Sequence, residues 1–285
     1  MALRVLTSVV LIPLVVALVW WGPPAALAAA AALVAGLSLW EFFSLADRLG
    51  LRAYRKWTLF CVALLFYAQY SLGLVETHHL GGRFSLVRDA AAGDVSIEAA
   101  LLVFLFGCVA IGLASRGAMH DVLPSMAASA VGLIFIALPF SYLIRLGEIE
   151  RVGRELVLFT LCLIWAGDML AYFVGRSLGR IPMAPRLSPK KTWEGAMGNL
   201  LASLIVGVLF ARWLQVEAMT LLIVAGLGNI AGQAGDLIES AYKRGAAVKD
   251  SGTIVPGHGG VLDRIDSLIL AAPVVWAAYQ WLGGR

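Results

Sequence analysis

The sequence predicts an all-α polytopic membrane protein with about nine transmembrane helices. Hydrophobic residues make up 60% of the 285 residues, and charged residues make up 14%, about half of their usual share in soluble proteins. Apolar residues also gather in long runs, most of which have the roughly 20 residues that a bilayer-spanning helix needs. These runs cover residues 3–21, 25–43, 57–75, 98–114, 122–145, 156–175, 196–214, 218–236 and 262–282.

The runs are expected to form a single membrane domain over residues 1–285, with an N-terminal group of helices (1–155) and a C-terminal group (156–285). The segment Gly22-Pro23-Pro24 predicts a tight hairpin between the first two runs. The first run also has features of a signal peptide, because Arg4 precedes an apolar core. We predict a retained helix instead, because that core is longer than a signal peptide needs and apolar residues resume directly after the hairpin.

Basic residues predict the orientation of the chain. With a cytoplasmic N-terminus, 14 of the 22 Lys and Arg residues lie in cytoplasmic segments and seven lie on the opposite side, while Arg264 begins the last run and belongs to neither group. The positive-inside rule therefore favours a cytoplasmic N-terminus. The two most polar loops of the C-terminal group, residues 176–194 and 236–266, then both face the cytoplasm.

Few groups with chemical function lie inside the apolar runs. Cys61, Cys108 and Cys162 all fall within runs and lack metal-binding spacing, so we interpret them as small buried residues. Glu41, near the end of the second run, is either a functional intramembrane acid or an interfacial residue close to Arg48. The sequence does not separate these two interpretations.

Asp168 lies deep inside the run 156–175, where a carboxylate must be paired or hydrated. One interpretation is a structural polar contact between helices. The other is a place in the wall of an active-site cavity. Tyr172 and Arg176, four and eight residues further on, point toward the loop that follows.

That loop, residues 176–194, carries five cations before its first acid. The positive-inside rule alone explains basic residues there. It does not explain the order Ser188-Pro189-Lys190-Lys191-Thr192, in which ammonium and hydroxyl groups at high density suit phosphate ligands. The sequence has no glycine-rich loop of the Walker A kind, which excludes a P-loop phosphotransferase.

Residues 236–266 form the most polar stretch of the chain. At about 100° per residue, Asp236, Glu239, Ser240 and Lys243 share one face of a helix that continues the preceding apolar run. Asn229 and Gln233 extend this polar face back into the membrane.

After this helix comes the glycine-rich segment Pro256-Gly257-His258-Gly259-Gly260, whose backbone N–H groups can approach an anion closely. A new helix then opens with Asp263, Asp266 and Ser267 on one face. Two helix ends that carry carboxylates, facing a glycine-rich loop and several cations, suggest Mg²⁺ holding a polyphosphate. We predict Asp236 and Asp263 as ligands of one or two Mg²⁺ ions, with Asp266 and Glu239 as weaker candidates.

Within this stretch the order Ser240-x-x-Lys243-Arg244-x4-Lys249-Asp250, followed by His258-Gly259-Gly260-x-x-Asp263-Arg264-x-Asp266, resembles the signature of the phosphatidate cytidylyltransferase family. The segment from Ser188 to Gly195 and the intramembrane Asp168 are also similar to that family. The resemblance covers roughly residues 160–280 and contains no departure within the signature.

The resemblance implies transfer of CMP from CTP to phosphatidic acid, giving CDP-diacylglycerol and pyrophosphate, at the cytoplasmic side of the C-terminal helices in a bacterial cytoplasmic membrane. The expected catalytic residues are Asp236, Asp263, Lys243 and Lys191. The expected substrate contacts are Ser188, Lys190, Lys191, Thr192, Ser240, Lys243, Arg244, Lys249, His258, Gly259, Gly260, Arg264 and Asp168. For His258 we favour ordering of the loop or donation to a phosphate over a general-base role, because a phosphate monoester is already mostly a dianion at neutral pH.

The expected partners are CTP, phosphatidic acid and membrane lipids, without nucleic acid, and the oligomeric state is open, with a homodimer among the options. Two other functions remain. A CTP-dependent polyprenol kinase would share the membrane setting and the metal acids but would release CDP. A transporter could use Asp168 and the glycine-interrupted helix near residues 226–235 to line a pathway, although the sequence shows no convincing internal repeat.

Overall fold

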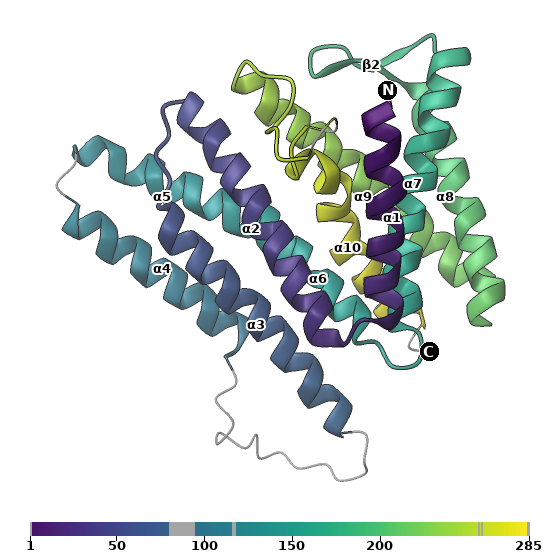
Figure 1. Ribbon diagram of the computed structural model, residues 1–285, viewed down its shortest axis with the longest axis horizontal. Coiled ribbons are helices and arrows are strands. Elements are labelled where there is room, and N and C mark those ends of the chain that lie inside the picture. Colours follow the sequence, from purple (N-terminus) through teal and green to yellow (C-terminus); the bar gives the residue numbers. More distant parts are fainter. Residues whose placement is uncertain (1, 80–94, 116–117, 256, 258, 284–285) are drawn as a thin grey trace.

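The computed structural model describes residues 2–79, 95–115, 118–255, 257 and 259–283, and most of these residues are helical (Figure 1). The α-helices are α1 (Ala2–Trp21), α2 (Pro24–Arg48), α3 (Arg55–His79), α4 (Ile97–Ala114), α5 (Val122–Val131), α6 (Leu138–Gly147), α7 (Gly153–Ser177), α8 (Trp193–Leu214), α9 (Ala218–Gly245) and α10 (Leu262–Gly283). A short 3₁₀ turn, η1 (Met119–Asp121), precedes α5, and a π-helical segment, η2 (Gly132–Ala137), joins α5 to α6. Each of the predicted apolar runs lies in a helix, which confirms the helical part of the prediction.

Seven helical segments among the described residues are long and apolar enough to cross a membrane. They are α2, α4, the continuous segment Met119–Gly147, α7, α8, α9 and α10. Several of them expose large apolar side chains, as Phe106 and Leu113 do on α4. A helix with such a surface is stable when lipid surrounds it, so the chain is an integral membrane protein.

The long helices lie side by side and run alternately in opposite directions (Figure 1). The N-terminus, the connection between α7 and α8 and the loop between α9 and α10 all lie at one end of the bundle, and the C-terminus lies at the other (Figure 1). The two polar loops singled out in the sequence therefore belong to the same end of the protein.

The connection between α7 and α8 is a small β-hairpin, which the prediction of an all-α fold did not include. Strands β1 (Pro182–Ala184) and β2 (Ser188–Thr192) pair in antiparallel orientation. The Thr192 side chain then caps α8 by accepting a hydrogen bond from the Gly195 N–H at 3.2 Å. Glu194 in the first turn accepts from the Ile181 N–H at 3.3 Å, which holds the base of the hairpin against the helix.

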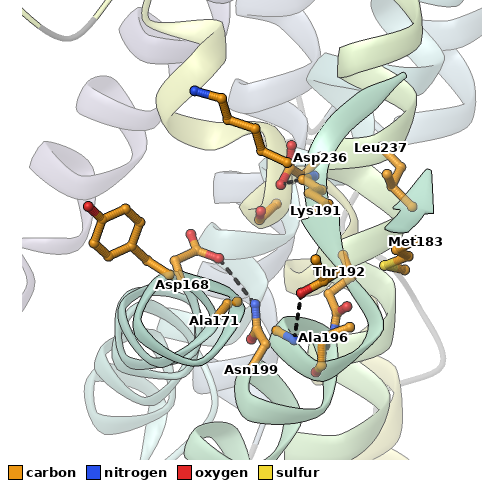
Figure 2. Close-up of a pocket in the computed structure, with 15 residues that line it drawn as sticks. Asp168, Ala171, Met183, Lys191, Thr192, Ala196, Asn199, Asp236 and Leu237 are labelled. Atoms are coloured by element: carbon orange, nitrogen blue, oxygen red, sulfur yellow. Dashed lines mark hydrogen bonds and ion pairs between the residues drawn. The ribbon is translucent and has the colours of Figure 1, made fainter. Parts of the chain in front are cut away.

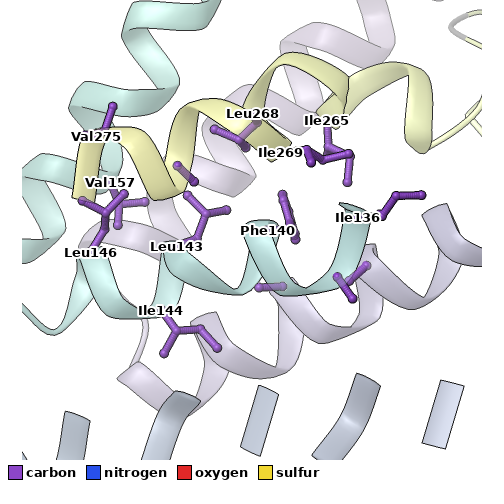
Figure 3. Packing of buried hydrophobic residues seen from close by; sticks show 14 of the residues in the cluster. Ile136, Phe140, Leu143, Ile144, Leu146, Val157, Ile265, Leu268, Ile269 and Val275 are labelled. Atoms are coloured by element: carbon purple, nitrogen blue, oxygen red, sulfur yellow. The ribbon is translucent and has the colours of Figure 1, made fainter. Parts of the chain in front are cut away.

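The segment from η2 to α6 joins the two halves of the chain. It packs against α2 and α3 of the N-terminal half and against α7 and α10 of the C-terminal half. Ile136, Phe140 and Leu143 lie between these helices with Ile265 and Ile269 of α10 nearby (Figure 3). All are buried, so apolar packing extends from the first half of the chain into the helix that begins beside the polar loop.

Candidate active site

A cavity of about 300 Å³ opens between the β-hairpin and the ends of α7, α8, α9 and α10 (Figure 2). Its lining combines acidic, basic and amide side chains with small residues. The lining residues are Asp168, Ala171, Tyr172, Gly175, Met183, Lys190, Lys191, Thr192, Gly195, Ala196, Asn199, Gln233, Asp236, Leu237 and Ser267. Five of the predicted site residues, Asp168, Lys190, Lys191, Thr192 and Asp236, therefore meet in one cavity.

Lys191 and Asp236 form an ion pair across this cavity, between β2 and α9 (Figure 2). Each side chain retains 28% exposure, so both remain accessible to a ligand. The neighbouring Lys190 also lines the cavity and has no ion-pair partner among the described residues. The hairpin thus brings two ammonium groups to the cavity, one balanced by a carboxylate and one available to an anion.

A ladder of polar side chains continues from the cavity into the helix bundle. The Asn199 amide donates to Asp168 Oδ1 at 3.3 Å (Figure 2), and Asn199 Oδ1 accepts from the Asn229 amide. Asn229 also donates to Ser203 Oγ at 2.7 Å, and Gln233 donates to Asn229 Oδ1 at 2.6 Å. Asn229 and Gln233 of the predicted polar face of α9 thus find their partners on α8 and on one another.

Asp168 therefore fits both interpretations made from the sequence. It contacts a neighbouring helix through Asn199, and it lies in the cavity wall. At the preceding residue, Gly167, a Cβ would collide with the Asn199 amide, so close approach of α7 and α8 requires glycine there. Sequence reasoning missed Asn199, although an asparagine four residues before Ser203 in an apolar run was a usable signal.

The carboxylates near the cavity act on one another. Asp168, Asp236 and Glu239 interact electrostatically with Asp266. The cations Lys191 and Arg264 interact in the same way with Asp168. Carboxyl groups are thus concentrated where α7, α9 and α10 meet. A bound cation, or the ammonium groups of the hairpin, would reduce this repulsion.

A second polar cluster lies beside the cavity and is centred on Lys243. Its ammonium group pairs with Glu239 one turn earlier on α9 and with Asp263 Oδ1 on α10 at 2.6 Å. The side chains of Glu239 and Asp263 are only 2% and 4% exposed. Predicted catalytic and metal-binding residues are brought together here, but away from the cavity lining.

Asp263 uses both oxygens of its carboxylate inside the protein. Besides the Lys243 contact, its Oδ2 accepts from the Ser251 N–H at 2.9 Å, the Ser251 hydroxyl at 2.9 Å and the Gly260 N–H at 2.8 Å. Asp263 therefore holds the loop between α9 and α10 (the α9–α10 loop, residues 246–261) against both helices. A metal ion could bind Asp263 only by displacing some of these donors.

Two glycines of this loop adopt backbone conformations that favour glycine. Gly257 and Gly259 adopt φ values of 78° and 83°, and the Val255 N–H donates to the Gly259 carbonyl at 3.0 Å, which closes a tight turn. The Gly260 N–H is already donated to Asp263. His258 lies outside the described residues.

Glu41 of α2 is a part of this region that sequence reasoning left undecided. It is 3% exposed, and its Oε2 accepts from the Ser251 hydroxyl at 3.0 Å and from the Leu262 N–H at 2.9 Å. Glu41 is therefore enclosed by the α9–α10 loop and pairs with its donors rather than with Arg48. A residue of the N-terminal half thus contacts the polar stretch directly.

The remaining predicted residues that the structure describes lie outside the lining of the cavity. Arg244 donates to the Leu187 carbonyl at the hairpin and to the Val248 carbonyl, both at 3.0 Å, so it links the hairpin to the α9–α10 loop. Ser240 is buried, Lys249 and Arg264 are exposed, and Ser188 lies in β2, where it pairs with Ala184.

The predicted metal ligands are not assembled into one set. Among the described residues, no group of three or more His, Cys, Asp or Glu side chains is arranged to hold a metal ion. Asp236 lines the cavity, Glu239 and Asp263 surround Lys243, and Asp266 lines a small void of about 10 Å³ together with Glu239. Of the four, Asp236 is the carboxylate that a ligand in the cavity can reach.

The fold and the site define an integral membrane protein that holds a polar, lysine- and carboxylate-lined cavity at one end of its helix bundle. Residues 2–282 match the model of the cytidylyltransferase family, and the chain belongs to that family.

Similar proteins carry the name phosphatidate cytidylyltransferase. The one from Bacillus subtilis is 39% identical over 145 residues, which is 50% of this chain and 54% of that protein. The one from Rickettsia bellii is 36% identical over 185 residues, which is 62% of this chain and 79% of that protein. The one from Haemophilus influenzae is 42% identical over 127 residues, or 42% of this chain and 44% of that protein. In the Bacillus and Haemophilus comparisons the chain thus spans about half of the relative's length.

Proposed function

We propose that the protein transfers the cytidylyl group of CTP to phosphatidic acid, giving CDP-diacylglycerol and pyrophosphate. The observation that carries this proposal is the cavity with Lys190, Lys191 and Thr192 opposite Asp236, inside a chain that matches the cytidylyltransferase family. Two ammonium groups and a hydroxyl suit a triphosphate. Relatives that bear the name of this activity support the choice of substrates.

The hairpin would hold the CTP phosphates. Lys190 is available to an anion, and Lys191 can exchange Asp236 for a phosphate oxygen without leaving the cavity. Lys243 and Arg244 are held by protein groups and would act on the substrates at longer range. Lys249 and Arg264 are exposed and could approach a phosphate at the membrane surface.

The reaction needs reduced repulsion between two anions more than it needs a base. The phosphate monoester of phosphatidic acid is mostly a dianion at neutral pH and can attack the α-phosphorus of CTP directly. One P–O bond forms and the bond to the departing pyrophosphate breaks. Cations on the hairpin would stabilise the charge that develops on the pyrophosphate.

Mg²⁺ is part of the proposal. The concentration of carboxylates around Asp168, Asp236 and Asp266 fits a hard cation in charge and ligand chemistry. Asp236 would be its first ligand, because it lines the cavity, and Asp266 the next. Asp263 and Glu239 would have to release Lys243 first. The metal would neutralise phosphate charge, while the residues described above bind and orient the substrates.

We also propose that the protein crosses a bacterial cytoplasmic membrane about nine times, with the N-terminus and the cavity on the cytoplasmic side. CTP would then reach the cavity from the cytoplasm, and the acyl chains of phosphatidic acid would stay in the bilayer. Membrane lipids would cover the exposed apolar faces, and a homodimer would bury part of them.

The test is product analysis with purified protein in detergent, CTP, phosphatidic acid and Mg²⁺. We expect pyrophosphate and CDP-diacylglycerol in equal amounts, and no product when either substrate is omitted. Release of CDP with a polyprenol as acceptor would point to a kinase. Absence of any CTP turnover would contradict the proposal.

A further inference from the structure

Glu41 connects the N-terminal half of the chain to the polar site. It lies in the membrane-spanning helix α2, 210 residues before Ser251 and 221 residues before Leu262, and it accepts hydrogen bonds from both. A carboxylate with 3% exposure in such a helix is stable only when donors surround it. Both bonds reach Oε2, while Oε1 has no hydrogen-bond partner among the described residues.

The contact with Leu262 supplies a cap that α10 lacks in its own sequence. Leu262 is the first residue of α10, and the first N–H groups of a helix have no partner within the helix. The residues just before it, Gly260 and Val261, have no side-chain oxygen that could accept such a bond. A carboxylate from α2 therefore takes the place of the usual capping side chain, where it also complements the helix dipole.

The backbone of the α9–α10 loop is shaped around the Glu41 carboxylate. A Cβ added to Gly252 or to Gly260 would collide with that carboxylate, so a larger residue at either position would displace Glu41. Phe42, the next residue of α2, packs edge-on against Tyr242 of α9 with ring centroids 5.6 Å apart. Helix α2 thus contacts the end of α9, the loop and the start of α10.

Ser251 transmits this contact to the charged cluster. Its hydroxyl oxygen lies 3.0 Å from Glu41 Oε2 and 2.9 Å from Asp263 Oδ2, so the two carboxylates share its single proton. Asp263 in turn pairs with Lys243. The second turn of α10 carries Asp266 and, one residue later, Ser267, which lines the cavity. A shift of Glu41 would therefore move the loop, Asp263 and the cavity edge together.

We propose that Glu41 is a positioning residue through which the N-terminal helices fix the α9–α10 loop and the start of α10 beside the cavity. Its effect on turnover rests on the proposed function, whereas its effect on the loop does not. Glu41 touches no substrate in this proposal and acts through Ser251 and the Leu262 N–H.

Three substitutions at one position separate geometry from charge. Glu41→Ala removes the acceptor. Glu41→Asp keeps the charge but shortens the side chain by one methylene, so it cannot reach both donors. Glu41→Gln keeps both bonds, because both end on one oxygen and the amide oxygen can replace it. Leu39→Ala is the matched control, since Leu39 is fully buried on the same helix and its loss destabilises the bundle without touching the loop.

The first measurement is hydrogen–deuterium exchange of peptides that contain Ser251 and Leu262. We expect faster exchange in Glu41→Ala and Glu41→Asp, and exchange close to that of the unmodified protein in Glu41→Gln and Leu39→Ala. If Glu41→Ala does not fold, Glu41→Asp gives the same comparison. Unchanged exchange in Glu41→Asp would overturn the proposal, even if the enzyme is a cytidylyltransferase.

The second measurement is turnover of CTP and phosphatidic acid at a temperature where all variants are folded. We expect kcat to fall by roughly tenfold to a hundredfold in Glu41→Ala and Glu41→Asp, with a smaller change in KM for CTP because the hairpin lysines are intact. Glu41→Gln should restore most of kcat. An equal loss of kcat in Leu39→Ala would show general destabilisation and overturn the proposal.

Discussion

Asp263 shows how a sequence can single out one side chain while its contacts remain unknown. Its place at the start of a helix after a glycine-rich segment suggested a metal ligand. The structure gives its carboxylate four donors from Lys243, Ser251 and Gly260. Asp236, predicted for the same role, lines the cavity and pairs there with Lys191. These two acids should therefore respond differently to the same substitution.

We predict that Asp263→Asn abolishes turnover and also lowers stability. The change removes the negative charge of Asp263 that balances the buried Lys243 ammonium group. Breaking a buried ion pair costs about 3–5 kcal/mol of stability. Asp236→Asn should abolish turnover with a much smaller loss of stability, because the Lys191–Asp236 pair is partly exposed. Thermal unfolding in detergent and initial rates over a range of Mg²⁺ concentrations measure both effects. Normal turnover by Asp263→Asn at saturating Mg²⁺ would remove Asp263 from the mechanism.

The lysines of the hairpin allow a second prediction at this scale. Replacing both Lys190 and Lys191 by Gln should lower kcat/KM for CTP at least tenfold, because one lost charge-assisted contact costs about 1.5–3 kcal/mol. Replacing both by Arg keeps the charge and serves as the control for topology. If the Gln variant inserts normally and its kcat/KM for CTP is unchanged, the two lysines only help to orient the chain in the membrane.

At the scale of elements, the helices were predictable because each is a run of about 20 apolar residues, and length alone identifies such runs. The extension of α9 to Gly245 followed from the shared face of Asp236 and Lys243. The β-hairpin was not predictable, because strands of three and five residues show no reliable alternation. It shapes the site, since it brings Lys190 and Lys191 to the lining of the cavity.

Arg244 was predicted from its charge to bind phosphate, whereas its contacts link two elements. We predict that Arg244→Lys, which keeps the charge but loses the forked donor geometry, increases hydrogen exchange in the hairpin and raises KM for CTP. Arg186→Ala, which removes an exposed cation from the same hairpin, is the matched control and should leave exchange unchanged. If Arg244→Lys shows normal hydrogen exchange in the hairpin and a normal KM for CTP, the positive charge at position 244 matters and the link between the hairpin and the α9–α10 loop does not.

At the scale of the whole molecule, the contacts between the two halves could not be derived from the sequence. Glu41 and Ser251 are separated by 210 residues, and periodicity within a run carries no information about partners at such distances. The signal available was a lone acid in an apolar run, which indicates an important position but not its partner. The alternation of helix directions, in contrast, follows from the order of runs and short connections, and the structure agrees with it (Figure 1).

This alternation gives the last prediction, which concerns orientation. The β-hairpin and the connection between α6 and α7 lie at opposite ends of the bundle (Figure 1), and the excess of basic residues lies on the side of the hairpin. Single cysteines at two exposed positions, Arg186→Cys in the hairpin and Glu150→Cys in that connection, report on the two sides. With a membrane-impermeant maleimide on spheroplasts, we expect labelling of Glu150→Cys alone, and labelling of both after lysis. The native cysteines lie in helices, so the unmodified protein is the blank. Labelling of Arg186→Cys before lysis would place the cavity outside the cytoplasm, where CTP is absent, and would contradict the proposed route of the nucleotide.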